Sequence, residues 1–394
     1  MAIKKIHIEN FKSFRDLTLE LGDFNVLIGA NASGKSNIVR AFEFLRDLSK
    51  LGLDNAVSLQ GGISYLRNIE IGSKQALLID VTSDTAKLGF SYRVQVKSNK
   101  TKTGFRLIED RLILKGDFRA GLTSNEFRME PGEFTLIHLN NKINIKTKGS
   151  AKEHEQGIIR VFQPSLEFLS NKEVLLRSPM IPLITGTKEV FGDISVYDFD
   201  PKLPKKPAPM AGKTELESDA GNLALVLRRI IEHPESKRKF SNLISDVLPF
   251  VKDLDIQKSA DNLLFKLQET YFSEYLPAPL ISDGTINLAA LIVALYFDNS
   301  TTTVIEEPER NLHPHLLAKV VDMLKDASRN KQVIVSTHNP QIVKHAGLEN
   351  ILLVSRDKDG FSTVSRPKDN KELRHFLREK IGLDELYIRD LLGK

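Results

Sequence analysis

The sequence predicts an α/β fold with a mainly parallel core sheet, an antiparallel β block and a helical lobe. Three observations lead to this prediction. An apolar strand, a glycine-containing loop and an amphipathic helix follow one another over residues 24–48. Residues 75–150 hold several short strand-like runs that turn residues separate. From residue 280 on, apolar strands alternate with helices, which is typical of a parallel sheet.

The loop over residues 29–36 reads GANASGKS and fits the pattern G-x-x-x-x-G-K-[ST]. It follows the branched apolar run 24–28 and precedes a helix predicted over residues 36–48. The backbone N–H groups of such a loop surround a polyphosphate at the N-terminus of the helix. Lys35 would then reach the β- and γ-phosphates, and the Ser36 hydroxyl would bind Mg²⁺. The alternative is an ordinary strand–helix turn that contains glycines, but the strand–loop–helix context favours phosphate binding.

Composition excludes several classes of protein. The chain has 394 residues, of which 41% are hydrophobic and 27% charged, so it is predicted to be globular rather than disordered. The absence of cysteine excludes disulfides, thiolate catalysis and cysteine-based zinc sites. No run of 18 apolar residues and no apolar signal segment occurs, so we expect a cytoplasmic protein. A net charge of +5 permits nucleic-acid binding without requiring it.

The remaining patterns divide the chain into three predicted segments. Residues 2–8 and 16–21 alternate as in a β-hairpin, and residues 201–213 contain four prolines, as in a loop or linker. Helical periodicity covers residues 215–249, and strand-like runs follow it at 251–257 and 262–270. The predicted segments are an N-terminal half over 1–200, a proline-rich linker with a helical and β insertion over 201–275, and a C-terminal half over 276–394.

Two strands of the C-terminal half end in chemically useful side chains. The run TTTVIEE ends in Glu306 and Glu307, and the run VIVSTH ends in His338. A buried strand that delivers acids at its end usually delivers them to a site, because burying unpaired charge is costly. Solvated glutamates and a structural histidine are the alternatives. Ser282 and Gly284 open another apolar helix, where Ser282 is either a simple helix cap or part of a phosphate-facing helix N-terminus.

The order of these segments resembles that of the ABC-type ATPases of the SMC, RecF and OLD (overcoming lysogenization defect) group. The opening IHIENFKSFRDLTLEL is similar to the N-terminal hairpin of the group, and GANASGKSN resembles its Walker A motif. EEPERNLHP and VIVSTHNPQIV resemble the Walker B and switch-histidine segments of the bacterial AAA-type ATPases related to OLD proteins. These motifs lie at both ends of the chain, and residues 60–275 match only loosely.

The resemblance implies a role for each motif residue. Glu306 would bind Mg²⁺ together with Ser36, Glu307 would be the general base, and His338 would sense the γ-phosphate. Ser282 and Gly284 would form the signature motif, which in this group acts on ATP bound to the other subunit. Gln163 is the predicted Q-loop glutamine, with Gln60 as the alternative. The residues expected to hold the triphosphate are Gly29, Asn31, Ala32, Ser33, Gly34, Lys35, Ser36 and Asn37.

Departures from the SMC pattern favour the RecF and OLD side of the group. Ala30 and Ala32 replace residues that are often proline and glycine, Asp283 and Thr285 alter the signature, and Glu306 replaces the commoner aspartate. The segment after His338 is short for the metal-binding nuclease domain of OLD enzymes. We therefore expect a free-standing ATPase whose effector, a nuclease or toxin, is a separate polypeptide.

The function predicted from these residues is hydrolysis of ATP with Mg²⁺, coupled to a homodimer that forms on ATP binding and gates DNA binding or a partner effector. The expected role is anti-phage defence or genome-integrity control. The alternatives are a RecF-like DNA repair ATPase and a slow nucleotide-sensing scaffold for a separate nuclease or toxin. A transporter subunit is disfavoured by the signature and the RecF-like N-terminus, so no membrane partner is expected. The residues predicted to contact duplex DNA are Arg228, Arg229, Lys237, Arg238 and Lys239.

Overall fold

The computed structural model describes residues 2–84, 88–99, 104–117, 131–139, 142–149, 152, 155–156, 173–178, 187–259, 261–367, 385 and 387. Contacts divide the chain into two compact units. The first unit comprises Met1–Asp23, Ala30–Ile194 and Val354–Ser365, and the second comprises Phe24–Gly29, Ser195–Leu353 and Arg366–Lys394. This division differs from the three consecutive segments expected from the sequence. The short strand β3 (Phe24–Ile28) belongs to the second unit because it pairs with strands from the C-terminal half.

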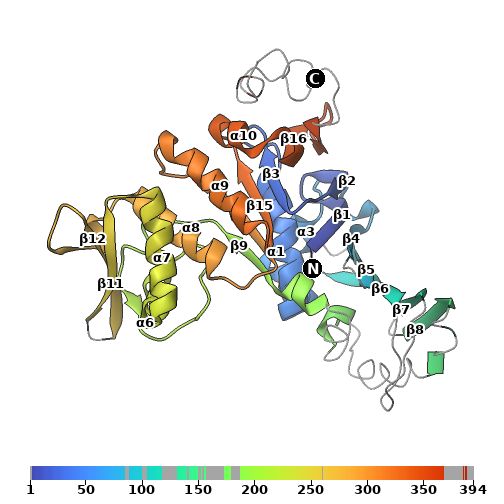
Figure 1. The fold of residues 1–394 in the computed structure, drawn as a ribbon. Helices are drawn as coiled ribbons and strands as arrows, with labels where there is room; N and C mark the ends of the chain where they lie inside the picture. The colour runs from blue at the N-terminus through green and yellow to red at the C-terminus, as the bar shows by residue number, and fades with distance from the viewer. Residues whose placement is uncertain are drawn as a thin grey trace. The chain divides into compact units, whose positions relative to one another are not determined.

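The first unit contains the predicted antiparallel β block, extended by the predicted N-terminal hairpin (Figure 1). Its seven strands have the order β2-β1-β4-β5-β6-β7-β8, and every neighbouring pair is antiparallel. The strands are β1 (Ala2–Phe11), β2 (Phe14–Glu20), β4 (Leu77–Asp84), β5 (Leu88–Ser98), β6 (Phe105–Asp117), β7 (Pro131–Leu139) and β8 (Lys142–Gly149). Alternating burial along β1 shows that one face of the sheet is covered, as the period of two predicted.

Helices and turns of the first unit pack on this sheet. The predicted helix after the glycine loop is α1 (Lys35–Leu51), whose Phe44 contacts Phe11 of β1 edge to face at a centroid distance of 6.4 Å. Phe191, in the π-helical turn η4 (Lys188–Gly192), covers Phe90 and Tyr92 of β5. The remaining elements are α2 (Leu53–Leu59), α3 (Ile63–Leu66), η1 (Gly72–Lys74), η3 (Leu175–Arg177) and β17 (Ser362–Ser365).

The core sheet of the second unit is mainly parallel, as predicted. Its strands have the order β16-β3-β15-β14-β9, with β9 (Ile194–Tyr197), β14 (Thr302–Glu306), β15 (Gln332–Thr337) and β16 (Ile351–Arg356). The pairs β14–β15, β15–β3 and β16–β3 are all parallel. All residues of β3 and β15 are buried, which explains why their sequences are apolar without alternation.

Three helices of the second unit follow the predicted alternation with strands: α8 (Asp283–Tyr296), α9 (Leu317–Ala327) and α10 (Pro340–Ala346). The short 3₁₀ turns η5 (Ala278–Leu280), η6 (Pro314–Leu316) and η7 (Leu348–Asn350) precede α8, α9 and β16. Helix α8 is buried from Thr285 to Leu295, so it is apolar on every side. Among the helices that the structure describes, none is long and apolar enough to cross a membrane.

The helical lobe lies in the second unit and combines two helices with a small sheet (Figure 1). Helices α6 (Leu223–Glu232) and α7 (Pro234–Val247) contact the hairpin of β11 (Val251–Ser259) and β12 (Asn262–Glu269), which β10 (Ala208–Pro209) and β13 (Tyr275–Pro277) extend. Helix α6 begins later than residue 215, where the helical pattern began. The Asn222 side chain donates to the carbonyls of Lys213 and Glu215 and accepts from the N–H of Glu217, which fixes a turn before the helix.

Candidate functional site

Three parallel strands of the second unit end at one edge of the sheet. Ile28 of β3 lies opposite Thr337 of β15, and Ser336 lies opposite Glu306 of β14. The next residue of each strand therefore leaves the sheet at this edge: Gly29, which opens the glycine loop, His338 and Glu307. The register thus brings together three positions that lie far apart in the sequence, Gly29, Glu307 and His338, at the edge where α/β sheets bind ligands.

The glycine loop has the backbone that a phosphate-binding loop needs. Ala32 and Gly34 have positive φ angles of 61° and 118°, and alternation with right-handed residues turns successive N–H groups into one concave surface. A side chain at position 34 would collide with the Ser362 hydroxyl, so this position requires glycine. Gly34 gives α1 no side-chain cap, and Lys35 donates to the carbonyl of Ala30 at 3.0 Å. The 17-residue helix α1 therefore begins without a side-chain cap from Gly34.

Side chains of the first unit support the loop from the β1–β2 turn and from the segment around β17. Asn37 donates to the Ser13 hydroxyl at 2.7 Å, and the Ser362 hydroxyl also donates to Ser13 at 2.7 Å. Arg356 donates through Nε to the carbonyl of Ala32 at 2.8 Å. The predicted loop residue Asn37 is thus fixed by a hydrogen bond, and the hydroxyl and guanidinium groups that hold the loop escaped the sequence prediction.

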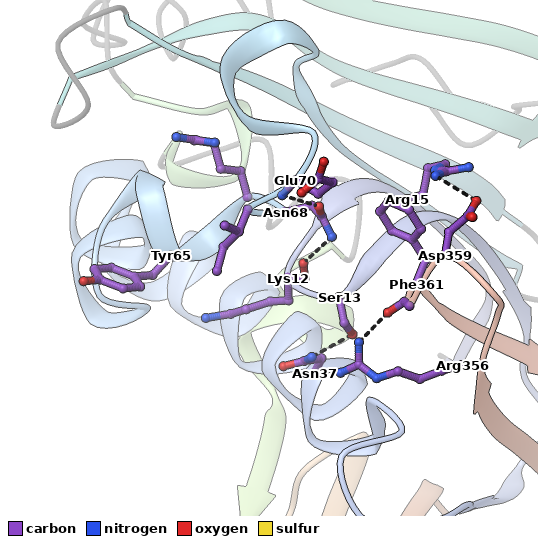
Figure 2. A pocket seen from close by; sticks show the side chains of 13 residues that line it. Lys12, Ser13, Arg15, Asn37, Tyr65, Asn68, Glu70, Arg356, Asp359 and Phe361 are labelled. Atoms are coloured by element: carbon purple, nitrogen blue, oxygen red, sulfur yellow. Dashed lines mark hydrogen bonds and ion pairs between the residues drawn. The ribbon is translucent and has the colours of Figure 1, made fainter.

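A pocket of about 800 Å³ lies beside this part of the first unit (Figure 2). Asn37, Ser13 and Arg356 line it together with further cationic side chains, among them Lys12 and Arg15. Burial lowers the pKa of Lys12, and repulsion from Arg40 lowers it further. Arg15 stacks its guanidinium 3.8 Å from the ring centre of Phe361. The pocket is therefore polar and partly aromatic, and its cationic side chains stand beside the acids Glu70 and Asp359.

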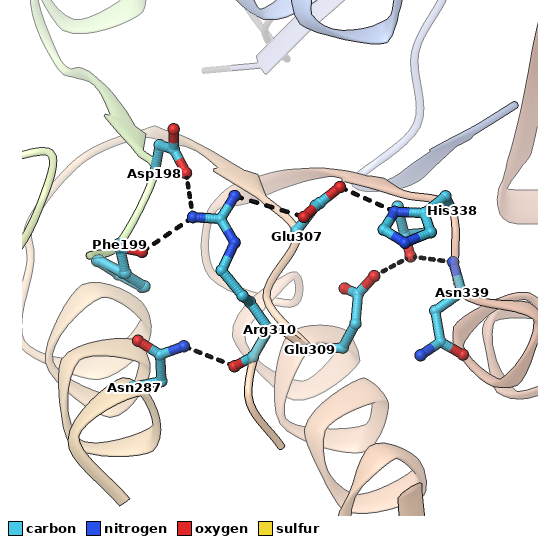
Figure 3. Close-up of polar contacts among 9 residues, drawn as sticks. Asp198, Phe199, Asn287, Glu307, Glu309, Arg310, His338 and Asn339 are labelled. Carbon is cyan, nitrogen blue, oxygen red and sulfur yellow. Dashed lines mark hydrogen bonds and ion pairs between the residues drawn. The ribbon is translucent and has the colours of Figure 1, made fainter. Parts of the chain in front are cut away.

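In the second unit, Glu307 lies between two cationic or polar groups (Figure 3). His338 donates through Nδ1 to Glu307 Oε1 at 2.8 Å, and Arg310 lies 3.4 Å from Glu307 Oε2. Glu307 has a positive φ of 46°, an uncommon conformation for a non-glycine residue, while its N–H donates to the Ser336 carbonyl at 2.8 Å. The structure thus pairs the predicted base with the predicted switch histidine and keeps the base at the strand end. Glu306, the predicted metal ligand, is half-buried as the last residue of β14.

Arg310 connects the base to a strand that the sequence reasoning did not assign to the site. Its guanidinium lies 2.8 Å from Asp198 and donates to the Phe199 carbonyl at 3.1 Å. Burial lowers the pKa of Arg310, but the carboxylates of Asp198 and Glu307 outweigh it and hold the pKa above its ordinary value. Asp198 directly follows β9, so the signal that could have found it is the same as for Glu307: an apolar strand that ends in an acid.

Ser282 caps α8 and accepts from the N–H of Thr285 at 3.2 Å. Gly284 lies so close to the turn after β14 that an added Cβ would lie 2.6 Å from the Asn311 carbonyl oxygen. One helical turn later, Asn287 donates to the Arg310 carbonyl at 2.6 Å. The predicted signature residues therefore begin a helix that packs on the turn carrying Glu307.

The sequence prediction missed Glu309, a buried carboxyl group that accepts from the Thr337 hydroxyl. It belongs to the segment EEPER over residues 306–310. A third acid so soon after the end of a strand is the sequence feature that could have indicated it. Gln163 lies outside the described residues. Its alternative, Gln60, is buried at the C-terminal end of α2, where its carbonyl accepts from Lys12 at 3.4 Å.

This fold is that of the ATPase heads of SMC proteins. The structure of an Smc head bound to the C-winged helix domain of ScpA aligns with a TM-score of 0.51 and 17% identity, covering 93% of this chain and 97% of that one. A family model described as "AAA domain, putative AbiEii toxin, Type IV TA system" matches residues 24–344, and the chain belongs to this family. The predicted resemblance to the SMC, RecF and OLD group is confirmed: this is an AAA-type ATPase of that group.

Curated relatives agree at low identity. A retron Vc95 probable ATPase of Vibrio cholerae is 20% identical, over 93% of this chain and 76% of the relative. An ATP/GTP phosphatase of Helicobacter pylori is 21% identical, over 87% of this chain and 86% of the relative. An OLD nuclease of Thermus scotoductus is 23% identical, over 99% of this chain and 67% of the relative.

Because α8 lies so close to the turn after β14, we expect a methyl group added at Gly284 to destabilise the folded protein. Gly284→Ala places a Cβ against the Asn311 carbonyl, which is backbone and cannot rotate away. We expect a loss of about 1–3 kcal/mol in the free energy of unfolding, despite the better helix propensity of alanine. The measurement is the urea midpoint. Gly212→Ala is the matched control, because its Cβ would meet only Leu225 at an ordinary 3.7 Å. Equal midpoints for both variants would contradict the packing described here.

Proposed function

We propose that this protein binds ATP with Mg²⁺ on the glycine loop and hydrolyses it with Glu307 as the general base. The observation that supports this most directly is the parallel register of β3, β15 and β14. It places Glu307 and His338 at the sheet edge where β3 continues into the loop. The relative named ATP/GTP phosphatase supports the same class of reaction.

The residues of the loop suit a nucleoside triphosphate. Its positive φ angles, the uncapped N-terminus of α1 and the position of Lys35 provide N–H groups and a cation for the phosphates. The pocket beside Asn37 has room for a ribose and a base. Ser36 and Glu306 offer only oxygen atoms, which Mg²⁺ prefers. When bound, Mg²⁺ neutralises charge on the phosphate oxygens during transfer.

In the proposed reaction a water molecule attacks the γ-phosphorus and the bond to the β–γ bridging oxygen breaks. Glu307 accepts a proton from the attacking water, while Lys35 stabilises the negative charge of the phosphates. His338, which holds Glu307 Oε1 at 2.8 Å, orients the base and reports on the γ-phosphate. Arg310 fixes the other carboxylate oxygen, so the base is positioned at both of its oxygen atoms.

Two substitutions separate binding from chemistry. Glu307→Gln keeps the size of the side chain but removes the base, so ATP should still bind while turnover falls about 10²-fold or more. Lys35→Ala should lose nucleotide binding itself. Fluorescent-nucleotide titration and phosphate release measure the two effects. Lys50→Ala, at the exposed far end of α1, is the control for removing a lysine from this helix. Glu307→Gln with undiminished turnover would disprove the assignment of the base.

The proposal extends to assembly: ATP binding drives or tightens a homodimer in which Ser282 and Gly284 complete the site of the other subunit. Its support is the resemblance of these residues to the signature motif and their place at the start of α8. Helix α8 contacts the turn that carries Glu307. Nucleotide bound by the partner subunit would therefore influence the position of Glu307 through this helix.

Dimer formation is tested by mass. Glu307→Gln with ATP and Mg²⁺ should sediment as a dimer, since the bound nucleotide then persists. Adding Ser282→Arg should restore the monomer with nearly intact nucleotide binding, because the large cation blocks closure. Ser282→Thr retains a hydroxyl that can cap α8 and serves as the matched control. A monomer in Glu307→Gln with and without ATP would rule out the dimer.

We further propose that the ATP-bound dimer gates duplex DNA or a separately encoded nuclease or toxin, in anti-phage defence or genome-integrity control. The OLD-like segments and the relatives named OLD nuclease and retron ATPase support this direction. A RecF-like repair ATPase would show turnover that DNA stimulates, and a slow nucleotide-sensing scaffold would show negligible turnover with or without DNA. Turnover measured under both conditions distinguishes these candidates.

Three of the five basic side chains proposed to contact DNA, within residues 228–239, already have partners in the protein. Lys237 pairs with Asp253 at 3.1 Å, Lys239 donates to the Tyr296 carbonyl at 3.2 Å, and Arg228 lies 3.5 Å from Glu232. Arg229 and Arg238 are exposed on the same pair of helices. A phosphate backbone could therefore contact Arg229 and Arg238 without breaking the ion pairs and hydrogen bonds that hold the other three side chains.

Replacing these two arginines tests the DNA proposal. Arg229→Glu/Arg238→Glu should weaken duplex binding and make the slope of log affinity against log salt less steep by about 2, since each phosphate contact contributes about 0.9. Lys202→Glu/Lys206→Glu changes the net charge equally at exposed sites in the proline-rich loop and is the control. Unchanged DNA affinity at low salt in the arginine variant would assign this surface to something other than DNA.

A further inference from the structure

Glu309 is a buried carboxyl group that the reaction above does not use. Its exposed fraction is 7%, and it lies in the turn after β14, two residues beyond the proposed base. One of its oxygens, Oε1, accepts from the Thr337 hydroxyl, whereas Oε2 is buried and has no hydrogen-bond partner. A buried polar atom without a partner is rare enough in folded proteins to need an explanation.

The direction of the Thr337 hydrogen bond is fixed by a second one. The Asn339 N–H donates to the Thr337 hydroxyl oxygen at 2.9 Å, so the hydroxyl proton points toward Glu309 (Figure 3). Glu309 thereby holds Thr337, whose hydroxyl oxygen in turn holds Asn339 at the other end of the turn that carries His338. The same His338 donates to Glu307 at 2.8 Å. Two contacts thus join the turn after β14 to the end of β15 and the turn that follows it: Glu309 with Thr337, and Glu307 with His338.

The surroundings of Glu309 disfavour a negative charge. Burial raises the pKa of Glu309, and the Glu307 carboxylate on the same turn raises it as well. Hydrogen bonds from the Thr337 hydroxyl and from the backbone N–H of Glu309 itself, together with His338, act in the opposite direction, but the pKa stays above its ordinary value. Glu307 and His338 are the charged or titratable groups that act on it from the two turns. Arg310 engages Glu307 and Asp198 rather than Glu309. Protonation of the carboxyl group removes this buried negative charge, which burial disfavours.

We propose that Glu309 is a positioning residue, which acts as a neutral carboxylic acid and fixes His338 against Glu307 through the Thr337 hydroxyl. This inference rests on the proposed function, because it regulates the geometry of the same base. Ionisation of Glu309 would place a second negative charge on the turn that carries Glu307. A neutral Glu309 therefore leaves Glu307 as the only negatively charged carboxyl group of the pair, and it still anchors the turn that carries His338.

Turnover and stability test the proposal separately. Glu309→Gln preserves the acceptor for Thr337 and the neutral state, so kcat should stay within about twofold of wild type at neutral pH. Thr337→Val removes the anchor and should lower kcat about tenfold with unchanged ATP affinity, since misplacing a catalytic group is costly. In a His338→Ala background, Thr337→Val should lower kcat no further, because its effect acts through that histidine. Wild-type turnover in Thr337→Val, or a full additional loss in the double variant, would overturn the positioning role.

The charge state has a readout that does not require activity. A carboxyl group with a raised pKa in the folded state binds its proton more tightly than in the unfolded chain. Wild type should thus lose stability as the pH rises from about 4.5 through that raised pKa, and Glu309→Gln should not. The difference in Tm, variant minus wild type, should therefore grow between pH 5 and pH 8. A difference that is constant or shrinks would show that Glu309 is ionised and would overturn the neutral acid. This measurement stands even if Glu307→Gln retains turnover and the proposed function fails.

Discussion

The parallel register of β3, β15 and β14 is the constraint on which the candidate site depends. Each residue in one strand has a fixed partner in the next, so the ends of the three strands meet at one edge. Glu307 and His338 are neighbours only because Glu306 lies opposite Ser336. A shift of one residue would turn every side chain of the moved strand to the other face and separate the pair. Complete burial of β3 and β15 resists such a shift, since both faces would change their packing.

Charge balance around Glu307 follows from this geometry. Glu307 and Glu309, two residues apart on a partly buried turn, repel each other, and a third acid, Asp198, directly follows β9. Arg310 compensates Asp198 and Glu307 together, and the burial of Glu309 favours its neutral form. The site thus combines three carboxyl groups with one guanidinium and one imidazole. Because Glu307 contacts both Arg310 and His338, substitutions at these three positions will not act additively.

Helix α8 joins the proposed signature residues, Ser282 and Gly284, to this cluster within the second unit. The short distance at Gly284 and the hydrogen bond from Asn287 leave little freedom between the helix and the turn. Because α8 is buried on every side, it moves as a rigid element or not at all. A nucleotide that engaged Ser282 would therefore act on a helix whose displacement reaches the Glu307 turn directly.

The sequence by itself determined the strand–loop–helix unit around Lys35, the antiparallel block and the acid-tipped strands, because these follow from local periodicity and from glycine at positions of positive φ. It also predicted the group to which the chain belongs, since the motifs are contiguous. Only the tertiary structure decided that Asp198 meets Arg310 and that Glu309 grips Thr337. Those contacts join residues from different strands, and strand order and register are set by packing between distant segments, which no local pattern encodes. For the same reason β3 belongs to the second unit, although most of its neighbours in sequence belong to the first.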